Sequence, residues 1–509
     1  MTWHNDPARN RAFAAGETEK IRWEVVPWTN GTGLDLGCGG AKLWDRSIGI
    51  DNGRSAANVS GDIAKLDLVA SGCMDYVYSS HALEDIEDTK AALAEWWRVL
   101  KVGGHLVLYL PHADFYPRVG KPGANGAHKH DFLPGDIVRV MQEVAPDWAL
   151  RENQERNQED EYSFLQVYTK RAPGLGQGAS LCESDPAKRC IVVRYGGFGD
   201  VLVASSVLPH LKAEGWHVTV YTGDKGAEVL RHDPHIDRLI EHDMLGLRAG
   251  ALSKLWAYLR GRCAKFVNFS ETFEQLMLAS PSRPNFWWPH EMRQRYMSGN
   301  YLEAAHAAAG VPQVYRQKFY PTFDEHLKAF DWRKKNVGKG RLIVIAATGS
   351  GVNKIWPGVF EYAGRMVLHH PDVHVAVLGG LYGAKMLEHE RIHEIGEAWS
   401  VRRALALALE ADLVIGQETG ILNAVALEPM PKIVLMSHSS GEQLCGHWVN
   451  TETLAGEVAC YPCHRLHKDW AGCNQDPSTK FAACQSAIEP MTAVALTERM
   501  LGLRERIAA

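Results

Sequence analysis

The chain has 509 residues, of which 46% are hydrophobic and 23% charged; this composition is typical of a globular protein and excludes a disordered or fibrous chain. The 55 Lys and Arg against 60 Asp and Glu leave a formal net charge of −5, which excludes the bulk positive field of a nucleic-acid-binding protein. The sequence contains no apolar run of 18 residues, and its start, MTWHNDPARNR, does not resemble a secretory signal, so we expect a cytoplasmic protein.

Three stretches share one pattern, in which a short β-branched run is followed by a glycine-rich turn and then a helical segment. They are residues 33–44, 190–211 and 341–367. Each stretch is typical of the start of a parallel α/β domain. The pattern therefore predicts an α/β protein with three Rossmann-like domains, in agreement with roughly 150 residues per domain.

The boundaries between these domains follow from local composition. A segment rich in Gly, Pro and Ser at 173–188 is expected to be a linker, and a charged, glycine-containing connection lies near 331–340. We therefore predict domains at 1–172, 189–335 and 336–509.

The first segment alternates expected strands with turns that can hold a nucleotide. Gly37 and Gly39 follow the first expected strand, and glycines there allow a tight turn and close approach of a ligand. Asp51 ends the second expected strand, where a carboxylate can accept both hydroxyls of a ribose. The expected strands lie at 33–36, 47–51, 75–80, 105–112 and 162–171, with Asp62 at the end of a further short strand and a helix at 87–101.

Residues 20–170 resemble the class I S-adenosylmethionine-dependent methyltransferases. The resemblance lies in LDLGCGG, IGIDNG, GDI, SSHALEDIED and EWWRVLKVGGHLVLYLPH. It implies a seven-stranded mixed sheet and an S-adenosylmethionine site. In that site the Asp-x-Gly-x-Gly turn, here Asp35, Gly37 and Gly39, cradles the methionine moiety, Asp51 holds the ribose, and Asp62 faces the adenine.

Two points about this domain stay open. A nicotinamide dinucleotide is the competing ligand, but the turn GCGGAK lacks the last glycine of G-x-G-x-x-G. The acceptor is weakly marked. His112, His128 and His130 are candidate bases, although each can equally be structural, and we expect an oxygen acceptor such as a sugar hydroxyl.

The second segment presents one carboxylate at a strand-to-helix turn. In RYGGFGDVLVASSVLP, Asp200 falls in the first turn of the expected helix. It is either a general base or a carboxylate that only stabilises the helix dipole.

The third segment contains two candidate phosphate loops. In AATGSGVNKIWP, the residues Thr348, Gly349 and Ser350 are followed by Lys354, and backbone N–H groups with a lysine suit a diphosphate. In ADLVIGQETGILNAVALEPMP, a strand runs into Glu418, Thr419 and Gly420. Each loop alone can be an ordinary turn, but together they indicate a nucleotide-sugar site.

These motifs make residues 190–500 similar to glycosyltransferase family 9, the ADP-heptose heptosyltransferases of the GT-B fold. The resemblance implies an inverting transfer that needs no metal at the reacting centre. Asp200 is implied as the base that deprotonates the acceptor hydroxyl, and Lys354, Thr419 and Gly420 as donor-binding residues. The chain departs from the family at Glu418, where the family has Asp, and at Asn423, where it has His. The stretch at 283–296 combines aromatic residues with arginines and is either an acceptor surface or a packed charged helix.

Four of the ten cysteines, Cys460, Cys463, Cys473 and Cys484, lie within 25 residues. In a cytoplasmic chain this spacing predicts a tetrathiolate site for Zn²⁺ or iron that staples the C-terminal segment. Free or redox-active thiols are the alternative, and His464 and His467 are spare ligands. A similar cluster occurs in the autotransporter heptosyltransferase branch, where it binds iron, and that branch modifies protein serines and forms large rings.

The sequence therefore predicts a bifunctional enzyme, with a methyltransferase followed by a heptosyltransferase-like pair of domains. The expected ligands are S-adenosylmethionine, an ADP-heptose-like donor and structural Fe or Zn, with a glycan or protein acceptor and no nucleic acid. Lipopolysaccharide biosynthesis, peripheral contact with the inner membrane and homo-oligomerisation are parts of this hypothesis. The alternative is that one half is an inactive binding or assembly module, for example a protein O-heptosyltransferase with a vestigial methyltransferase.

Overall fold

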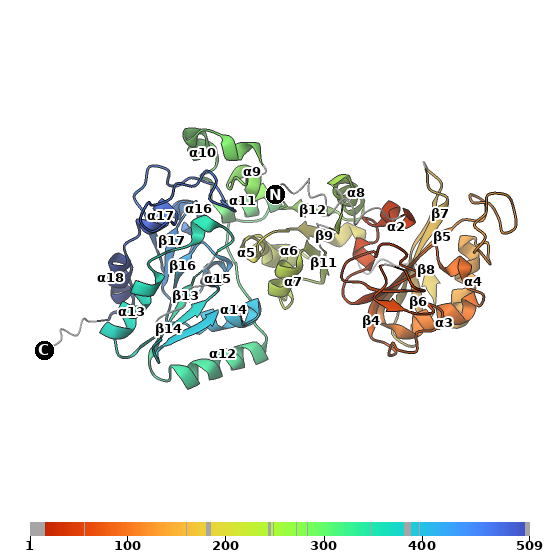
Figure 1. Cartoon of the computed structure of the whole chain (residues 1–509), viewed down its shortest axis with the longest axis horizontal. Coiled ribbons are helices and arrows are strands. Elements are labelled where there is room, and N and C mark those ends of the chain that lie inside the picture. Colours follow the sequence, from red (N-terminus) through yellow and green to blue (C-terminus); the bar gives the residue numbers. More distant parts are fainter. Residues whose placement is uncertain are drawn as a thin grey trace. The chain divides into compact units, whose positions relative to one another are not determined.

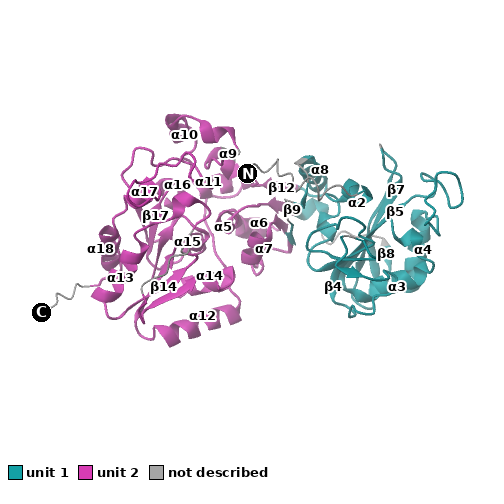
Figure 2. Ribbon diagram, viewed as in Figure 1, with its two compact units in different colours: residues 1, 3–189, 240–264 teal, residues 2, 190–239, 265–509 magenta. Residues whose placement is uncertain are grey.

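The structure is a computed structural model that describes residues 16–54, 56–158, 160–179, 185–242, 246–247, 249–270, 272–281, 283–347, 349–380, 388–396 and 398–503. The chain forms two compact units. Unit 1 consists of residues 3–189 with 240–264, and unit 2 of residues 190–239 with 265–509 (Figures 1 and 2). Each unit is described by itself below.

Unit 1 is built on one eight-stranded sheet in the order β3-β2-β1-β4-β5-β7-β6-β8. The strands are β1 (Gly33–Leu36), β2 (Ile48–Asp51), β3 (Val59–Ser60), β4 (Met74–Ser80), β5 (Leu100–Pro111), β6 (Trp148–Arg156), β7 (Ser163–Lys170) and β8 (Gly178–Ala179). The helices are α2 (Gly16–Ile21), α3 (Thr89–Val99), α4 (Pro134–Val144) and α8 (Ala249–Arg260), with short 3-10 turns at Val26–Trp28, Leu83–Asp85 and Pro186–Lys188.

The sheet is mixed, as the sequence predicts. Strands β1 to β5 pair in parallel, whereas β7 runs antiparallel to both β5 and β6. The sheet has one strand more than the seven expected, because β8, within the expected linker 173–188, pairs with β6.

Burial explains why α3 forms where it does. Its apolar residues recur at helical spacing and face the sheet, including Leu93 and Trp96, which are fully buried. The Asp88 carboxylate accepts a hydrogen bond of 2.9 Å from the Ala91 amide and caps the helix. The packed helix therefore anchors residues 81–88, which connect the carboxyl end of β4 to α3.

Residues 240–264, which the sequence places in the expected 189–335 domain, pack within unit 1. The Glu152 carboxylate of β6 accepts hydrogen bonds from the Tyr258 hydroxyl at 2.8 Å and from Arg262 Nη2 at 3.0 Å. The Arg46 guanidinium pairs with Glu241 at 3.2 Å.

Unit 2 contains a four-stranded sheet, β11-β10-β9-β12, and a six-stranded sheet, β15-β14-β13-β16-β17-β18. The first comprises β9 (Arg189–Val193), β10 (His217–Thr222), β11 (Arg238–Glu241) and β12 (Lys265–Asn268), with α5 (Phe198–Ser205), α6 (Leu208–Ala213), α7 (Asp224–Leu230), α9 (Thr272–Leu276), α10 (His290–Tyr296) and α11 (Tyr301–Ala309). A 3-10 turn lies at Pro284–Trp287.

The six-stranded sheet comprises β13 (Arg341–Ala346), β14 (Val373–Leu378), β15 (Ile392–Gly396), β16 (Leu413–Gln417), β17 (Lys432–Met436) and β18 (Thr451–Ala455). Its helices are α12 (Phe323–Asn336), α13 (Val359–His369), α14 (Val401–Leu409), α15 (Gly420–Val425), α16 (Gly441–Cys445), α17 (Ala483–Ser486) and α18 (Pro490–Leu501), with a 3-10 turn at Val352–Lys354. All of its pairings are parallel, so the carboxyl ends of its strands share one edge, where ligands bind in open α/β sheets.

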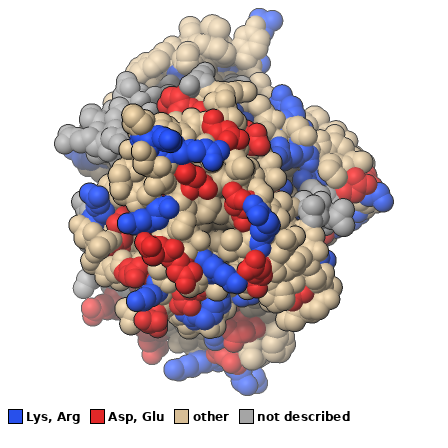
Figure 3. Space-filling model, turned by 90° about the vertical axis from the view of Figure 1, so that its right-hand side faces the viewer, with Lys and Arg blue, Asp and Glu red and all other residues tan. Residues whose placement is uncertain are grey.

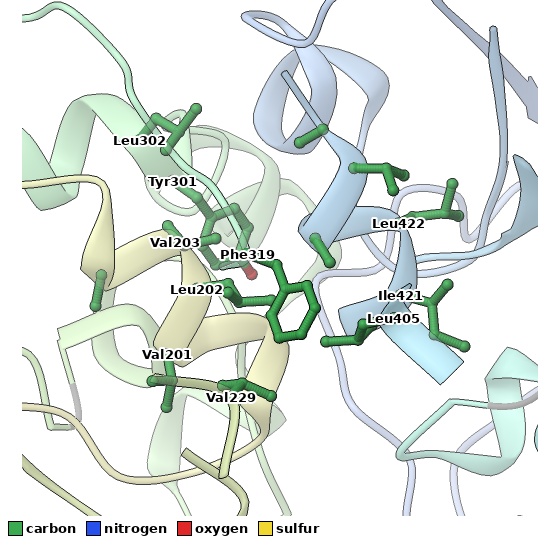
Figure 4. Packing of buried hydrophobic residues seen from close by; sticks show 14 of the residues in the cluster. Val201, Leu202, Val203, Val229, Tyr301, Leu302, Phe319, Leu405, Ile421 and Leu422 are labelled. Carbon is green, nitrogen blue, oxygen red and sulfur yellow. The ribbon is translucent and has the colours of Figure 1, made fainter. Parts of the chain in front are cut away.

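A continuous apolar core joins the two sheets of unit 2. It contains Leu202 of α5, Leu405 of α14 and Leu422 of α15, each fully buried. Figure 4 shows the ring of Phe319 lying between the helix that carries Leu202 and the helix that carries Leu405. Burial of this surface fixes α5 against α15, which matters for the site described below.

The predicted α/β class with largely parallel sheets is thus confirmed. On the face shown in Figure 3, Lys and Arg alternate with Asp and Glu, in keeping with the net charge of −5. Within the described ranges, no helix has both the length and the apolar character needed to cross a bilayer.

Candidate functional sites

Asp200 lies in the first turn of α5 and is held by a buried arginine. Arg194 Nη2 is 3.1 Å from Asp200 Oδ2. The Arg194 guanidinium also donates to both oxygens of Glu274, at 2.9 and 3.0 Å, and to the Phe269 carbonyl at 2.8 Å. Because Arg194 is only 1% exposed, it is a fixed positive charge that orients the Asp200 carboxylate. Sequence reasoning missed both Arg194 and Glu274.

Two glycines let α5 and α15 approach closely. A Cβ atom on Gly199 would lie 3.1 Å from the Gly420 Cα, and one on Gly420 would overlap the ring of Phe198. Neither position therefore accepts a side chain without displacement of its neighbours. This close approach brings the helix that carries Asp200 to the turn formed by Thr419 and Gly420.

Glu418 follows β16 and is bound by a loop that the sequence did not indicate. Its Oε1 accepts hydrogen bonds from the backbone amides of Ser437, His438 and Ser439 at 2.7, 3.2 and 3.2 Å. His438 Nδ1 lies 2.5 Å from Oε2. Burial opposes ionisation of Glu418, but the neighbouring His438 and Lys354 lower its pKa to about 2. The carboxylate is therefore a buried negative charge, and the length of Glu lets it reach these amides.

Lys354 lies beside this carboxylate and within the electrostatic reach of Asp200. Its Nζ donates to the Glu418 carbonyl at 2.6 Å. Burial lowers the pKa of Lys354, while the charges of Glu418 and Asp200 raise it. Gly349 lies against the Lys354 side chain, since a Cβ atom on Gly349 would be 2.5 Å from Lys354 Cδ. The structure thus brings together three residues predicted from separate motifs.

The remaining predicted donor residues differ in their surroundings. Thr419 is buried, and its Oγ1 has no hydrogen-bond partner among the described residues. The Asn423 side chain instead donates to the Thr419 carbonyl at 3.0 Å and accepts from Gln317 at 3.2 Å, so it ties α15 to the preceding loop. Ser350 is exposed, and Thr348 lies outside the described residues.

A cavity of about 330 Å³ opens at the glycine turn after β1 in unit 1. Its lining includes Gly37 and Gly39, together with His81, which directly follows β4. This volume lies within the range of small-molecule pockets. The turn Gly37–Ala41 is therefore the part of unit 1 best placed to meet a ligand.

The three predicted acids differ in their burial and in their hydrogen bonds. Asp35 is buried and accepts a hydrogen bond of 2.5 Å from the Leu43 amide, and burial raises its pKa to about 7. Asp51 accepts from the Gly39 amide at 2.7 Å and the Asn52 amide at 2.6 Å; a carboxylate with two such bonds still has acceptor sites for ribose hydroxyls. Asp62 is exposed and accepts from the Ala64 amide at 2.9 Å.

The predicted histidines do not form one group. His112 lines a different cavity and stacks on Phe115 at 4.0 Å between ring centroids. His130 Nε2 lies 3.1 Å from the Glu87 carbonyl. Only His128 belongs to a cluster near the glycine turn.

That cluster centres on Glu84, which is fully buried between two imidazoles. Glu84 Oε1 lies 3.8 Å from His81 Nδ1 and 3.7 Å from His128 Nε2, and His81 Nε2 lies 2.9 Å from Ser163 Oγ. Burial raises the pKa of Glu84 to about 8 and lowers that of His81 to about 3. Sequence reasoning missed His81 and Glu84, although their place directly after a parallel strand was a usable signal.

Glu84 is expected to destabilise unit 1 as the pH rises, and His81 opposes this effect below pH 6.5. The net loss of stability is therefore expected between about pH 6.5 and 8. The pKa of Glu84 is raised from 4.5 to about 8, so its contribution is fully present below pH 4.5 and lost as the pH rises through about 8. His81 acts oppositely: its pKa falls from 6.5 to about 3, so its contribution is lost only as the pH falls below 6.5. Glu84→Gln should therefore raise Tm at pH 8, by about 2–4 °C for each kcal/mol that ionisation of the buried Glu84 costs, measured by thermal unfolding.

The control for this prediction is Glu87→Gln, because Glu87 is exposed on the same turn. It should leave the pH dependence unchanged. Asp35, whose pKa is raised to about 7, also makes unit 1 lose stability as the pH rises to that value. The effect of Glu84 is therefore measured as the difference in Tm between wild type and Glu84→Gln. An equal slope in wild type and Glu84→Gln would contradict the role of Glu84.

The four clustered cysteines line one cavity of about 100 Å³ in unit 2. Arg293, Arg465 and His467 also line it, whereas His464 is buried elsewhere with its Nδ1 3.1 Å from Gln443 Oε1. Within the described ranges, no group of three or more His, Cys, Asp or Glu side chains has the arrangement of a metal site. The structure therefore supports the gathering of the four thiols, but the metal itself belongs to the proposals below.

The stretch at 283–296 packs against this cysteine segment. Arg293 of α10 is buried, and its Nε donates to the Cys463 carbonyl at 2.7 Å. Trp287 remains 69% exposed. The buried arginine shows that part of this stretch is a packed element.

Comparison with known proteins addresses both units. Residues 34–108 match the family model described as a methyltransferase domain. The chain carries a methyltransferase domain. This match confirms the prediction that the chain is an enzyme, and no curated protein matches it in sequence.

Solved structures similar to a larger part of the chain are glycosyltransferases. A glycosyl transferase of family 9 from Veillonella parvula DSM 2008 is 13% identical, with a TM-score of 0.45, over 64% of this chain and 100% of that one. ADP-heptose lps heptosyltransferase II from E. coli is 13% identical, with a TM-score of 0.43, over 62% and 98%. The iron-containing dodecameric glycosyltransferase TibC from enterotoxigenic E. coli H10407 is 13% identical, with a TM-score of 0.42, over 67% and 82%.

Proposed function

We propose that the chain is a bifunctional transferase. Unit 1 would transfer a methyl group from S-adenosylmethionine to a sugar or glycan hydroxyl, and unit 2 would transfer a heptose-like sugar from an ADP-linked donor, with inversion, to a surface glycan or a protein. The convergence of Asp200, Lys354 and Glu418 from three separate motifs supports the second activity. The cavity at the glycine turn, within the matched methyltransferase domain, supports the first.

In the proposed methyl transfer, S-adenosylmethionine supplies an activated methyl group when bound. Gly37 and Gly39 leave room for the ligand beside the turn, and Asp51 has acceptor capacity for the ribose hydroxyls. Asp35 binds the chain that follows the turn through the Leu43 amide, and the exposed Asp62 would meet the base. These residues fit the group by shape and by hydrogen-bonding capacity.

In the proposed glycosyl transfer, Asp200 accepts the proton of the acceptor hydroxyl as its oxygen bonds to the anomeric carbon of the donor. The bond from that carbon to the diphosphate breaks at the same time, and the diphosphate leaves with the bonding electrons. Lys354 would bind this leaving group together with Gly349, Ser350, Thr419 and Gly420. Thr348, which lies outside the described residues, belongs to the same proposed set. The buried Thr419 hydroxyl has no hydrogen-bond partner among the residues that the structure describes, and it is a suitable donor to the ligand.

We also propose that the four thiols, which line one cavity, hold a structural metal. A tetrathiolate of Zn²⁺ or Fe²⁺ carries two net negative charges, and the two guanidinium groups that line the same cavity, Arg293 and Arg465, would offset them. The proposed role is to hold Cys460, Cys463, Cys473 and Cys484 together, with no part in the chemistry.

The proposed setting completes the hypothesis. We propose the methyltransferase at 1–172 and the two glycosyltransferase domains at 189–335 and 336–509, except that residues 240–264 pack within the unit of the methyltransferase. The proposed setting is the cytoplasm, in lipopolysaccharide or glycoprotein synthesis. Contact with the inner membrane and self-association belong to the same proposal. Calorimetry of the full chain with S-adenosylhomocysteine and with ADP tests it: binding of both supports two active halves, binding of one leaves the other as an assembly module, and binding of neither refutes both.

Asp51→Ala tests the methyl-donor site directly. We expect it to weaken binding of S-adenosylhomocysteine by about 10–100-fold, because hydrogen bonds from the ribose to a charged acceptor are lost. Asp45→Ala, at an exposed aspartate of the same unit, is the matched control and should bind as wild type does. If Asp51→Ala bound S-adenosylhomocysteine as tightly as wild type does, Asp51 would not be part of the site. ADP binding should be the same in both proteins.

A further inference from the structure

The segment between Cys463 and Cys473 contacts the loop that follows β13 and carries Lys354. The Val352 amide donates to the His467 carbonyl at 2.9 Å, and the His467 amide donates to Asn353 Oδ1 at 3.3 Å. Lys468 Nζ donates to the Ser350 carbonyl at 2.9 Å. A Cβ atom on Gly351 would lie 2.7 Å from the His467 carbonyl oxygen, so glycine is required for this approach. The loop that carries Lys354 is thus held by the cysteine segment.

The same segment also holds the loop that binds Glu418. The His464 amide donates to the His438 carbonyl at 2.8 Å, and the His438 amide is one of the three that bind Glu418 Oε1. Residues 464–468 therefore contact both loops that follow the donor strands β13 and β17. The cysteine segment is part of the wall of this site, although it follows β18 in the sequence.

Lys468 extends from this segment toward the charged residues of the site. Its side chain is exposed. Partial burial and the positive charge of Lys354 lower the pKa of Lys468, while Asp200 raises it and Lys225 lowers it further. These interactions place the Lys468 ammonium within electrostatic reach of Lys354 and Asp200. A lysine ammonium has three N–H donors, and the bond to the Ser350 carbonyl uses one of them.

We propose that Lys468 is a second diphosphate-binding residue of the donor site, acting with Lys354 on the leaving nucleoside diphosphate. The proposal rests on the glycosyl-transfer function proposed above and adds to it a residue outside its motifs. A nucleoside diphosphate carries more negative charge than one lysine can neutralise, and Lys354 already shares its charge with Glu418 and Asp200. The exposed Lys468 supplies the further positive charge through the N–H donors that Ser350 does not use.

The test is calorimetric titration of the full chain with ADP and with adenosine. Lys468→Met keeps the unbranched stem and removes the ammonium, and we expect it to weaken ADP binding about tenfold or more. Adenosine has no phosphate, so its affinity should not change. Lys335→Met, at an exposed lysine of α12, is the matched control and should bind both ligands as wild type does.

Each other outcome overturns the proposal. If Lys468→Met binds ADP with wild-type affinity, Lys468 does not contact the diphosphate, and the proposed function stands without it. If ADP and adenosine weaken equally and Tm falls, Lys468 only supports the fold through Ser350. If wild type binds no ADP at all, the proposed glycosyl transfer fails together with the inference.

Discussion

Asp200→Ala is expected to lower glycosyl transfer by about 10²–10⁴-fold, the range for loss of a general base, while ADP binding stays intact. The reason is geometric: Asp200 is the carboxylate that α5 presents beside the Thr419–Gly420 turn. Release of ADP from ADP-heptose, measured with a cell-envelope glycan fraction as acceptor, checks the rate. Calorimetry with ADP checks the affinity.

The fold should tolerate this substitution because Arg194 keeps its other partners. Its guanidinium remains paired with both oxygens of Glu274, at 2.9 and 3.0 Å, and bonded to the Phe269 carbonyl. No buried charge is therefore left without a counter-charge. We expect Tm to change little, which separates lost chemistry from lost structure.

Two further variants sharpen the Asp200 experiment. Asp200→Asn keeps an oxygen that can accept from Arg194 but removes the basic carboxylate, and it should be as inactive as the alanine variant. Asp224→Ala is the matched control, since Asp224 is an exposed aspartate in the first turn of α7 in the same unit. Full transfer by Asp200→Asn would show that Asp200 is not the base.

Local sequence was sufficient to locate the strands that precede the ligand turns. Strands β1, β9, β13 and β16 lie where buried apolar runs meet glycine-rich turns, because both signals come from neighbouring residues. The prediction of Asp200, Lys354 and Glu418 as one group rested on the order of their motifs. The close approach of Gly199 to Gly420 brings Asp200 to this group, and the hydrogen bond from Lys354 to the Glu418 carbonyl joins the other two.

The partners of these residues could not be predicted, since they come from distant parts of the chain. His438 reaches Glu418 only because β17 pairs with β16, and Lys468 reaches Ser350 only through the folding of the cysteine segment. The Asn423 side chain likewise accepts a hydrogen bond from a residue far away in the sequence, Gln317. Pairing between strands and loops far apart in sequence leaves no periodic signal in either segment.

Loss of one cysteine of the cluster is also expected to have a large effect, on both bound metal and Tm. Cys473→Ser should reduce bound Zn or Fe from about one per chain to a small fraction, because loss of one thiolate weakens a four-ligand site by more than the 10–100-fold typical of an outer partner. Metal analysis of the purified chain measures this directly. Since a structural metal contributes several kcal/mol to folding, the Tm of the variant should fall by about 10 °C.

The control is Cys73→Ser, because Cys73 lies in unit 1 and its thiol donates to the Ala70 carbonyl at 2.9 Å, a bond that serine can also make. The Cys73→Ser variant should bind as much metal as wild type and have the same Tm. A chelator should lower the Tm of wild type and of Cys73→Ser to that of Cys473→Ser, but should have no effect on Cys473→Ser itself. Wild-type protein with no bound metal, or an unchanged Tm in Cys473→Ser, would instead favour free thiols. Because residues 464–468 contact the loops that follow β13 and β17, the loss of metal should also weaken ADP binding.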